Sequence, residues 1–123
     1  MKPILVVEDD ADTRELMVEL LQGAGFPVHA APDGRKALDH LLTGAKNEPS
    51  LIVLDLAMPG MTGWEFLGIV RNYLRLAAIP VILISGSKPE ADAVKRHRIS
   101  GVFEKPVDPD GLLARVREVL QVT

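Results

Sequence analysis

Six polar side chains follow or interrupt the short apolar runs of this sequence. They comprise four carboxylates, a hydroxyl and an ammonium: Glu8, Asp9, Asp10, Asp55, Ser85 and Lys105. Carboxylates about 4 Å apart repel one another by roughly 4 kcal/mol per pair at an effective dielectric constant near 20. A divalent cation offsets that repulsion, and oxygen ligands without histidine or cysteine favour Mg²⁺ or a similar hard ion.

The hydroxyl and the ammonium extend this chemistry to phosphate. Protein-bound Mg²⁺ keeps several water molecules and is often shared with phosphate oxygens. The Lys105 ammonium and the Ser85 hydroxyl are suitable hydrogen-bond donors to the same oxygens. The sequence has no glycine-rich phosphate loop, which argues against a bound nucleotide. We therefore expect a phosphoryl group carried by the protein itself, with a carboxylate as its acceptor.

Each of these residues also has an ordinary structural interpretation. Asp10 or Asp12 could cap the helix that follows the first apolar run. A lysine at a strand end, such as Lys105, is most often structural, and Ser85 alone indicates nothing. Asp55 is harder to explain in this way, because an unpaired carboxylate in a buried run is costly. The prediction of a site therefore depends on the joint placement of these residues.

The elements that must position these residues are five short apolar runs, alternating with five segments of helical periodicity. The expected strands cover residues 4–8, 26–31, 51–56, 79–85 and 101–104. Continuous apolar strands joined by helices indicate a parallel sheet covered on both faces. The expected fold class is α/β, a doubly wound (βα)5 unit, and this class implies the flavodoxin-like strand order 2-1-3-4-5. Because ligands of such sheets bind beyond the carboxyl ends of the strands, the polar residues should meet there.

The expected helices differ in how much apolar surface they can bury. The third carries Phe66, Leu67, Val70 and Leu74 on one face. The fourth, within residues 88–98, has few apolar side chains to bury, so we expect it to be weakly packed.

Composition limits the classes of function. The 123 residues, 47% of them apolar and 25% charged, fit one soluble domain covering residues 1–123. A net charge of −3 gives no sign of binding to nucleic acid or to a membrane surface. The absence of cysteine excludes disulfides and thiolate chemistry. No stretch approaches the ~18 apolar residues of a membrane span, and the first apolar run is too short for a secretion signal. We expect a cytoplasmic protein.

Four motifs follow one another along the chain: ILVVEDD, LIVLDLAMPGMTG, VILISG and FEKPV. Together with the alternation of strands and helices, they resemble the receiver domain of two-component response regulators, and the resemblance covers essentially the whole chain. It implies a phosphoacceptor signalling domain, either a single-domain regulator or a receiver excised from a longer protein. Its phosphodonor would be a histidine kinase or a histidine phosphotransfer protein. The domain would not be an enzyme in the usual sense, since it would catalyse only its own phosphorylation and dephosphorylation.

The resemblance also implies a role for each residue of the site. Asp55 resembles the phosphoacceptor of the family. Glu8 and Asp9 resemble its acidic pair, with Asp9 contacting Mg²⁺ directly and Glu8 through water. Ala57 occupies the position whose backbone carbonyl completes the metal shell, so its side chain is not important there. Lys105 resembles the lysine that pairs first with the acceptor and then with the phosphoryl group.

The resemblance further implies a switch at the surface. Ser85 resembles the hydroxyl that reorients toward the phosphoryl group, and the surface affected is usually the fourth helix, fifth strand and fifth helix. The output partner is unknown, and the domain would be a monomer or a phosphorylation-dependent dimer. The family often has an aromatic residue where this chain has Val102, and Phe103 should point to the opposite face. Only residues 86–104 separate Ser85 from Lys105, so we expect a reduced or displaced fourth helix.

Two other classes of function remain open. One is an interaction domain that has the receiver fold but is not phosphorylated. The other is a Mg²⁺-dependent aspartyl phosphatase, because the DAD sequence of residues 10–12 superficially resembles the motif of that class. That motif needs threonine or valine where Arg14 stands, and the chain has no cap domain.

Overall fold

Five parallel strands form the sheet in the described part of the chain, which comprises residues 1–44, 46 and 48–122 of a computed structural model. They are β1 (Ile4–Val7), β2 (Val28–Ala31), β3 (Leu51–Asp55), β4 (Val81–Ser85) and β5 (Gly101–Glu104). Their order across the sheet is β2-β1-β3-β4-β5. The expected parallel sheet and its flavodoxin-like order are therefore confirmed.

The register of the sheet brings the carboxyl ends of the strands together. Glu8 follows the last residue of β1, and that residue pairs with Leu54, so Asp55 occupies the neighbouring position on β3. Lys105 follows the residue of β5 that pairs with Ser85 at the end of β4. The polar residues identified in the sequence therefore share one edge of the sheet.

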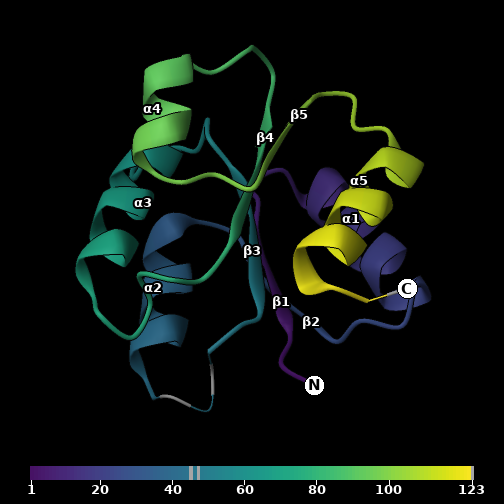
Figure 1. Cartoon of the computed structure of the whole chain (residues 1–123), viewed down its shortest axis with the longest axis horizontal. Coiled ribbons are helices and arrows are strands. Elements are labelled where there is room, and N and C mark those ends of the chain that lie inside the picture. The colour runs from purple at the N-terminus through teal and green to yellow at the C-terminus, as the bar shows by residue number, and fades with distance from the viewer. Residues whose placement is uncertain (45, 47, 123) are drawn as a thin grey trace.

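Helices cover both faces of this sheet. In the described residues they are α1 (Ala11–Gly23), α2 (Gly34–Leu42), α3 (Gly63–Asn72), α4 (Ala91–Arg96) and α5 (Pro109–Leu120). Figure 1 shows α1 and α5 on one side of the sheet, with α2, α3 and α4 on the other. None of the helices in the described residues is both long enough and apolar enough to span a bilayer.

Alternate residues of the three central strands, β1, β3 and β4, contribute to two hydrophobic clusters, one on each face. Leu5, Ile52 and Leu83 pack beside α2 and α3, whereas Val6 and Val53 pack beside α1 and α5. All five side chains are almost completely buried. Burying a side chain of this size stabilises the fold by about 1.5–3 kcal/mol. The strands are continuously apolar because both faces of the sheet are covered.

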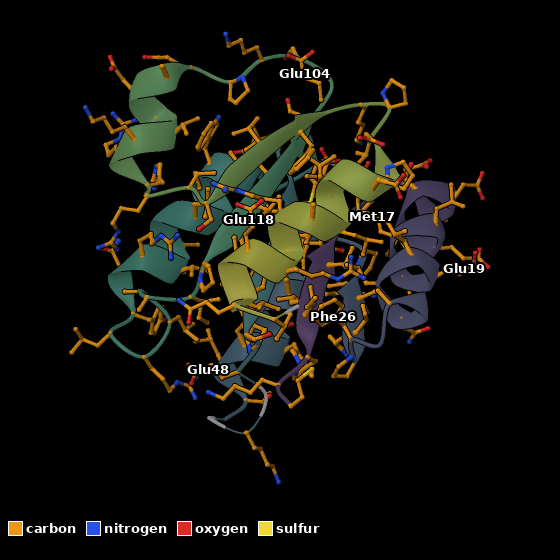
Figure 2. All side chains as sticks on the ribbon, turned by 45° about the vertical axis from the view of Figure 1, so that its right-hand side comes forward. Met17, Glu19, Phe26, Glu48, Glu104 and Glu118 are labelled. Carbon is orange, nitrogen blue, oxygen red and sulfur yellow. The ribbon has the colours of Figure 1, made fainter. Side chains whose placement is uncertain are left out.

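Helix α1 buries one of its faces. Met17 and Leu21 belong to the cluster on the α1–α5 face, as does Phe26 in the loop after the helix. Figure 2 shows Met17 and Phe26 directed inward, while Glu19 extends away from α1. Leu16 is the apolar exception, because it lies beside the buried stripe and is 66% exposed.

Aspartates cap three of the helices at their N-termini, and Asp33 does so for α2. Asp10 caps α1, because its Oδ2 accepts hydrogen bonds from the N–H of Thr13 at 2.9 Å and from the Thr13 hydroxyl at 2.7 Å. Asp108 caps α5 in the same way and precedes a proline at the first helical position. Such a cap stabilises a helix by about 1 kcal/mol. Of the two candidates left open for α1, Asp10 is the cap, and Asp12 lies in the first turn.

The expectation for Leu74 was wrong, whereas that for α4 is confirmed. Helix α3 ends at Asn72, so Leu74 lies beyond it and is 98% exposed, while Leu76 is fully buried in its place. Helix α4 has only six residues, of which Ala93 alone is buried. The expected reduction of the fourth helix therefore agrees with the structure.

The expected difference between Val102 and Phe103 is also confirmed. Val102 is 36% exposed, whereas Phe103 packs against the cluster on the α1–α5 face. The two side chains therefore lie on opposite faces of β5.

Candidate functional site

Three charged side chains meet at the carboxyl edge of the sheet. Asp55 and Glu8 are 2% and 1% exposed, so both carboxylates are buried. The Lys105 ammonium reaches both of them, with its Nζ 3.1 Å from Glu8 Oε1 and 3.4 Å from Asp55 Oδ2. One cation thus serves two buried carboxylates, and the group carries a net negative charge when all three are ionised.

A third carboxylate completes an acidic cluster. Glu8, Asp9 and Asp55 each offer one oxygen, and these oxygens lie within 4.8 Å of one another. Asp9 is exposed, so the cluster opens to solvent on its side. The arrangement brings together the three carboxylates that the sequence analysis assigns to the metal.

Burial changes the protonation of this cluster. Burial is the largest cause that raises the pKa of Glu8 from 4.5 to about 7, the hydrogen bond and the charge of Asp55 act in the same direction, and the Asp10 N–H and Lys105 partly oppose them. Burial lowers the pKa of Lys105, but the Glu8 and Asp55 carboxylates outweigh this effect, so the net pKa lies above its ordinary value. The Lys105 ammonium is therefore charged at neutral pH, whereas Glu8 is held close to its titration point.

These residues fit a hard divalent cation. Glu8 Oε1 lies within ion-pair distance of Lys105, yet it accepts no well-aligned hydrogen bond from the described residues. A buried acceptor without such a bond is costly, and a cation or its bound water can satisfy it. The ligand set contains only oxygen, which suits Mg²⁺ better than a transition metal. The acidic cluster therefore agrees with a magnesium site in its chemistry.

The loop after β3 holds Asp55 and Ala57 in place. The N–H of Ala57 donates to Asp55 Oδ1 at 3.2 Å, so the Ala57 backbone lies against the candidate acceptor. The loop closes when the N–H of Gly63 donates to the Leu56 carbonyl at 2.9 Å. A Cβ at Gly63 would lie 2.7 Å from the Cα of Leu56, so only glycine allows this approach. The assignment of the Ala57 carbonyl to the metal shell stays a prediction.

Ser85 is at the same edge, but its hydroxyl is directed elsewhere. The Ser85 hydroxyl donates to the Ser87 carbonyl and accepts from the Ser87 N–H. Both of its hydrogen bonds among the described residues thus stay within the loop after β4. The reorientation toward a phosphoryl group, which the resemblance implies, would require these two bonds to break.

Arg14 also belongs to this region, although the sequence pattern assigned it no role in the site. Arg14 lies on α1, and its Nη1 donates to the backbone carbonyls of Glu8 and Asp9 at 2.9 and 3.3 Å. The only sign of such a role in the sequence is the position of Arg14 in the first turns of α1, shortly after the three acids. Asp10 is separate from the acidic cluster in function, because hydrogen bonds from Thr13 occupy its carboxylate and lower its pKa.

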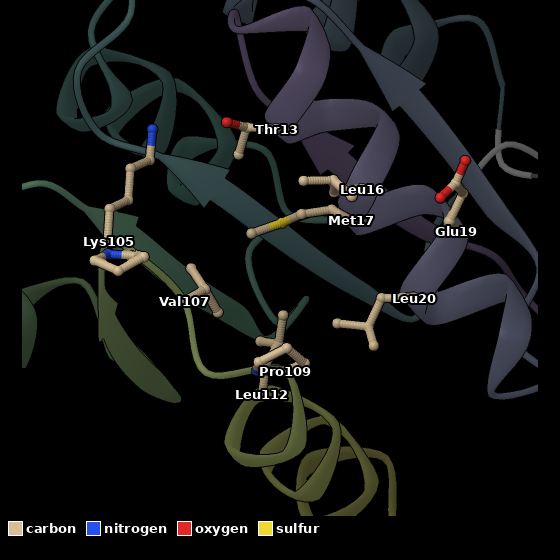
Figure 3. Close-up of a pocket in the computed structure, with 10 residues that line it drawn as sticks. Thr13, Leu16, Met17, Glu19, Leu20, Lys105, Val107, Pro109 and Leu112 are labelled. Carbon is tan, nitrogen blue, oxygen red and sulfur yellow. The ribbon is translucent and has the colours of Figure 1, made fainter.

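An apolar groove of about 830 Å³ lies beside the site, between α1 and the loop that enters α5. Figure 3 shows Leu16 and Leu20 on one wall, with Val107 and Pro109 opposite them. Lys105 lines the end of this groove and also contacts Asp55. The groove therefore connects an exposed apolar surface with the acidic cluster.

A family model described as the response regulator receiver domain matches residues 4–117. The chain belongs to this family. This receiver domain has a doubly wound fold and takes part in two-component signalling, and phosphoacceptor signalling is the function consistent with that membership.

Curated relatives support the same family. The receiver domain is 38% identical to an uncharacterised 14.6 kDa protein of Leptolyngbya boryana, over 94% of this chain and 87% of that protein. It is 34% identical to the transcriptional regulatory protein GltR of Pseudomonas aeruginosa, over 98% of this chain and 49% of that protein. The chain spans about half the length of GltR and of other transcriptional regulators that it matches.

Solved structures support the fold. The chemotaxis protein CheY4 of Vibrio cholerae superposes with a TM-score of 0.87 at 30% identity, covering 97% of this chain and 98% of that one. A response regulator receiver protein of Pseudomonas putida gives a TM-score of 0.86 at 29% identity, covering 96% of this chain and 98% of that one. The receiver domain therefore shares its architecture with these proteins over almost the whole chain.

Proposed function

We propose that this receiver domain accepts a phosphoryl group on Asp55 from a histidine kinase or a histidine phosphotransfer protein, in a Mg²⁺-dependent reaction in the cytoplasm. The observation that carries the proposal is the acidic cluster, in which buried Asp55 lies beside Glu8, Asp9 and the Lys105 ammonium. A buried carboxylate with one cation and two acidic neighbours is poorly compensated until it binds a metal or reacts.

The transfer is an in-line displacement at phosphorus. A carboxylate oxygen of Asp55 forms the new bond to phosphorus, while the bond from phosphorus to the histidine nitrogen breaks and its electron pair stays on the imidazole. Glu8, Asp9, Asp55 and the Ala57 carbonyl would hold Mg²⁺ at this site, where the ion would supply positive charge to the transferring oxygens. Lys105, already 3.4 Å from Asp55 Oδ2, turns from the carboxylate to the phosphoryl oxygens.

The apolar groove between α1 and α5 supports a protein phosphodonor. Its walls are leucine, valine and proline side chains, of which Leu16 and Pro109 are exposed and Leu20 and Val107 half-buried, and its end is Lys105. An exposed apolar groove of this kind suits contact with another protein better than contact with water. We infer that the phosphodonor lies against this groove while its phosphohistidine reaches Asp55. The domain itself catalyses only its own phosphorylation and dephosphorylation.

A second groove supports an output surface at the edge of the sheet that β5 forms. It has a volume of about 540 Å³ and lies between α4 and β5. Val94, Ile99 and exposed Val102 form its apolar part, and Lys88 and Lys95 are among its basic residues. The loop from Ser85 leads directly to this groove, so breaking the bonds between Ser85 and Ser87 would move one of its walls. We infer an unidentified output partner, or a second copy of the phosphorylated domain, at α4, β5 and α5.

Asp55→Asn tests the proposal directly. Wild-type protein is incubated with Mg²⁺ and a small acyl phosphate, or with beryllofluoride, and its intact mass and Trp64 fluorescence are recorded. We expect the mass of one added phosphoryl group, dependent on Mg²⁺ and absent in Asp55→Asn. Asp33→Asn, which removes the carboxylate that caps α2, is the matched control and should be labelled normally.

The outcomes separate the alternatives. Absence of labelling and of any Mg²⁺ response in the wild type would favour an interaction domain with the receiver fold. Sustained hydrolysis of diverse phosphate esters would favour an aspartyl phosphatase, although Asp10 already caps α1. Labelling that persists in Asp55→Asn would overturn the assignment of the acceptor.

A further inference from the structure

Arg14 ties the start of α1 to the end of β1. Its side chain returns toward the sheet, and its Nη1 donates to the Glu8 carbonyl at 2.9 Å and to the Asp9 carbonyl at 3.3 Å. The residue is partly buried, so these hydrogen bonds are shielded from water on one side. A single guanidinium nitrogen thus bridges two successive peptide units, those that carry two carboxylates of the acidic cluster.

The other bonds of this loop leave Asp9 dependent on that bridge. The N–H of Glu8 donates to Ala31, and the N–H of Asp10 donates to Glu8 Oε2 at 3.2 Å, so both neighbours of Asp9 are fixed independently. For Asp9, the contact with Arg14 is the only hydrogen bond recorded within the described residues. Its carboxylate is exposed and has no ion pair within those residues.

We propose that Arg14 is a positioning residue for the magnesium site, an inference that rests on the proposed function. The guanidinium fixes the peptide unit of Asp9 beside the independently held Glu8, so that the Asp9 carboxylate is held toward the cation before it binds. Preorganisation of this kind removes an ordering cost from binding. Arg14 acts through the backbone of the ligands and does not itself contact the ion.

The charge of Arg14 makes this role distinguishable from an electrostatic one. A guanidinium close to a cation site repels the cation. If charge were the only effect of Arg14, removing the guanidinium should therefore tighten Mg²⁺ binding. Loss of positioning has the opposite effect, because Asp9 then has to be ordered on binding. The direction of the change in affinity therefore decides between the two roles.

The test measures Mg²⁺ affinity in Arg14→Met by titrating Mg²⁺ and following the backbone amide NMR signals of the acidic loop. We expect a Kd about tenfold higher than in the wild type, at the low end of the loss usual for residues that support metal ligands. Labelling by a small acyl phosphate should need correspondingly more Mg²⁺ and approach the wild-type rate at saturation. Arg14→Lys, which keeps the charge and a donor, should recover part of the affinity.

Arg75→Met is the matched control. Arg75 donates from its Nη2 to the Leu41 carbonyl at 2.8 Å, near the C-terminal end of α2, so the substitution removes the same charge and the same type of bond away from the site. We expect an unchanged Kd for Mg²⁺ in this variant. If Arg14→Met fails to fold, Arg14→Gln compared with Arg75→Gln provides the same test.

The outcomes distinguish this inference from the proposed function. If the wild type binds Mg²⁺ and is labelled, but Arg14→Met binds Mg²⁺ as well as Arg75→Met or more tightly, the positioning role is overturned and the proposed function stands. If the wild type neither binds Mg²⁺ nor is labelled, the proposed function itself fails, and the inference fails with it.

Discussion

At the scale of single residues, Glu8 controls how the protein responds to pH. Burial raises its pKa from 4.5 to about 7, so the folded state holds a proton that the unfolded state releases between these values. The free energy of unfolding therefore falls as pH rises through this window, because the folded state binds more protons there. Lys105 also has a raised pKa, but its contribution is lost only at alkaline pH, outside this window.

We expect the metal-free protein to lose up to about 3 kcal/mol of stability between pH ~5 and pH ~8, since one pKa unit corresponds to about 1.4 kcal/mol. Saturating Mg²⁺ should reverse the loss, because the ion stabilises ionised Glu8. Urea unfolding at several pH values, with and without Mg²⁺, measures both effects. Glu8→Gln should flatten the pH dependence. A metal-free stability that rises over this range in the wild type would contradict the prediction.

The residues of the site were predictable to different degrees. Glu8, Asp55 and Lys105 could be placed from the sequence, because a parallel sheet brings strand ends to one edge whatever the side chains do. The direction of the Ser85 hydroxyl could not be predicted from the sequence, since rotation about one bond decides whether it faces Ser87 or the acidic cluster. Arg14 could not either, because a bond from a side chain to a backbone carbonyl leaves no periodic pattern in the sequence.

At the scale of elements, the end of α3 shows why helix boundaries are difficult to predict. Leu74 continues the apolar spacing of the helix, yet the chain leaves the helix after Asn72. Arg71 holds the returning segment, because its guanidinium donates to the carbonyls of Ala77 and Ile79 at 2.9 and 2.7 Å. These hydrogen bonds leave no trace in the apolar spacing of the sequence, and they hold the segment that carries the buried Leu76.

Leu76→Ala and Leu74→Ala provide a matched test of this boundary. Leu76 is fully buried, so its truncation should lower the free energy of unfolding by about 2–5 kcal/mol through lost burial and a cavity. Leu74 is almost fully exposed, and its truncation should change stability by less than about 0.5 kcal/mol. Urea unfolding of both variants measures the difference. Equal losses would show that α3 continues through Leu74.

At the scale of the whole molecule, one sheet joins the two hydrophobic clusters. Each central strand contributes alternate residues to both clusters, so neither can be lost while the other stays intact. The alternation of strands and helices predicted this layering. The position of β1 between β2 and β3 depends on long-range pairing, which no local stretch of sequence specifies, so it came from the fold class.

We therefore expect residues 1–123 to unfold as one cooperative domain. Trp64 packs against the hydrophobic cluster beside α2 and α3, so its fluorescence reports on that face of the sheet, whereas far-UV circular dichroism reports on all helices. The two signals should give coincident urea transitions, as for most single domains of this size. Separate midpoints would show that the two faces are independent units.

The contact between Lys105 and Asp55 has a consequence for synthesis. The two residues are 50 positions apart, and Lys105 follows the last strand of the sheet. On a ribosome that adds ~5–20 residues per second, Asp55 precedes its cation by roughly 3–10 s. A nascent chain that closed β1 against β3 in that interval would bury Glu8 and Asp55 without the lysine. Mutual repulsion of the two acids thus opposes early closure, and completion of the acidic edge coincides with the arrival of the final strand.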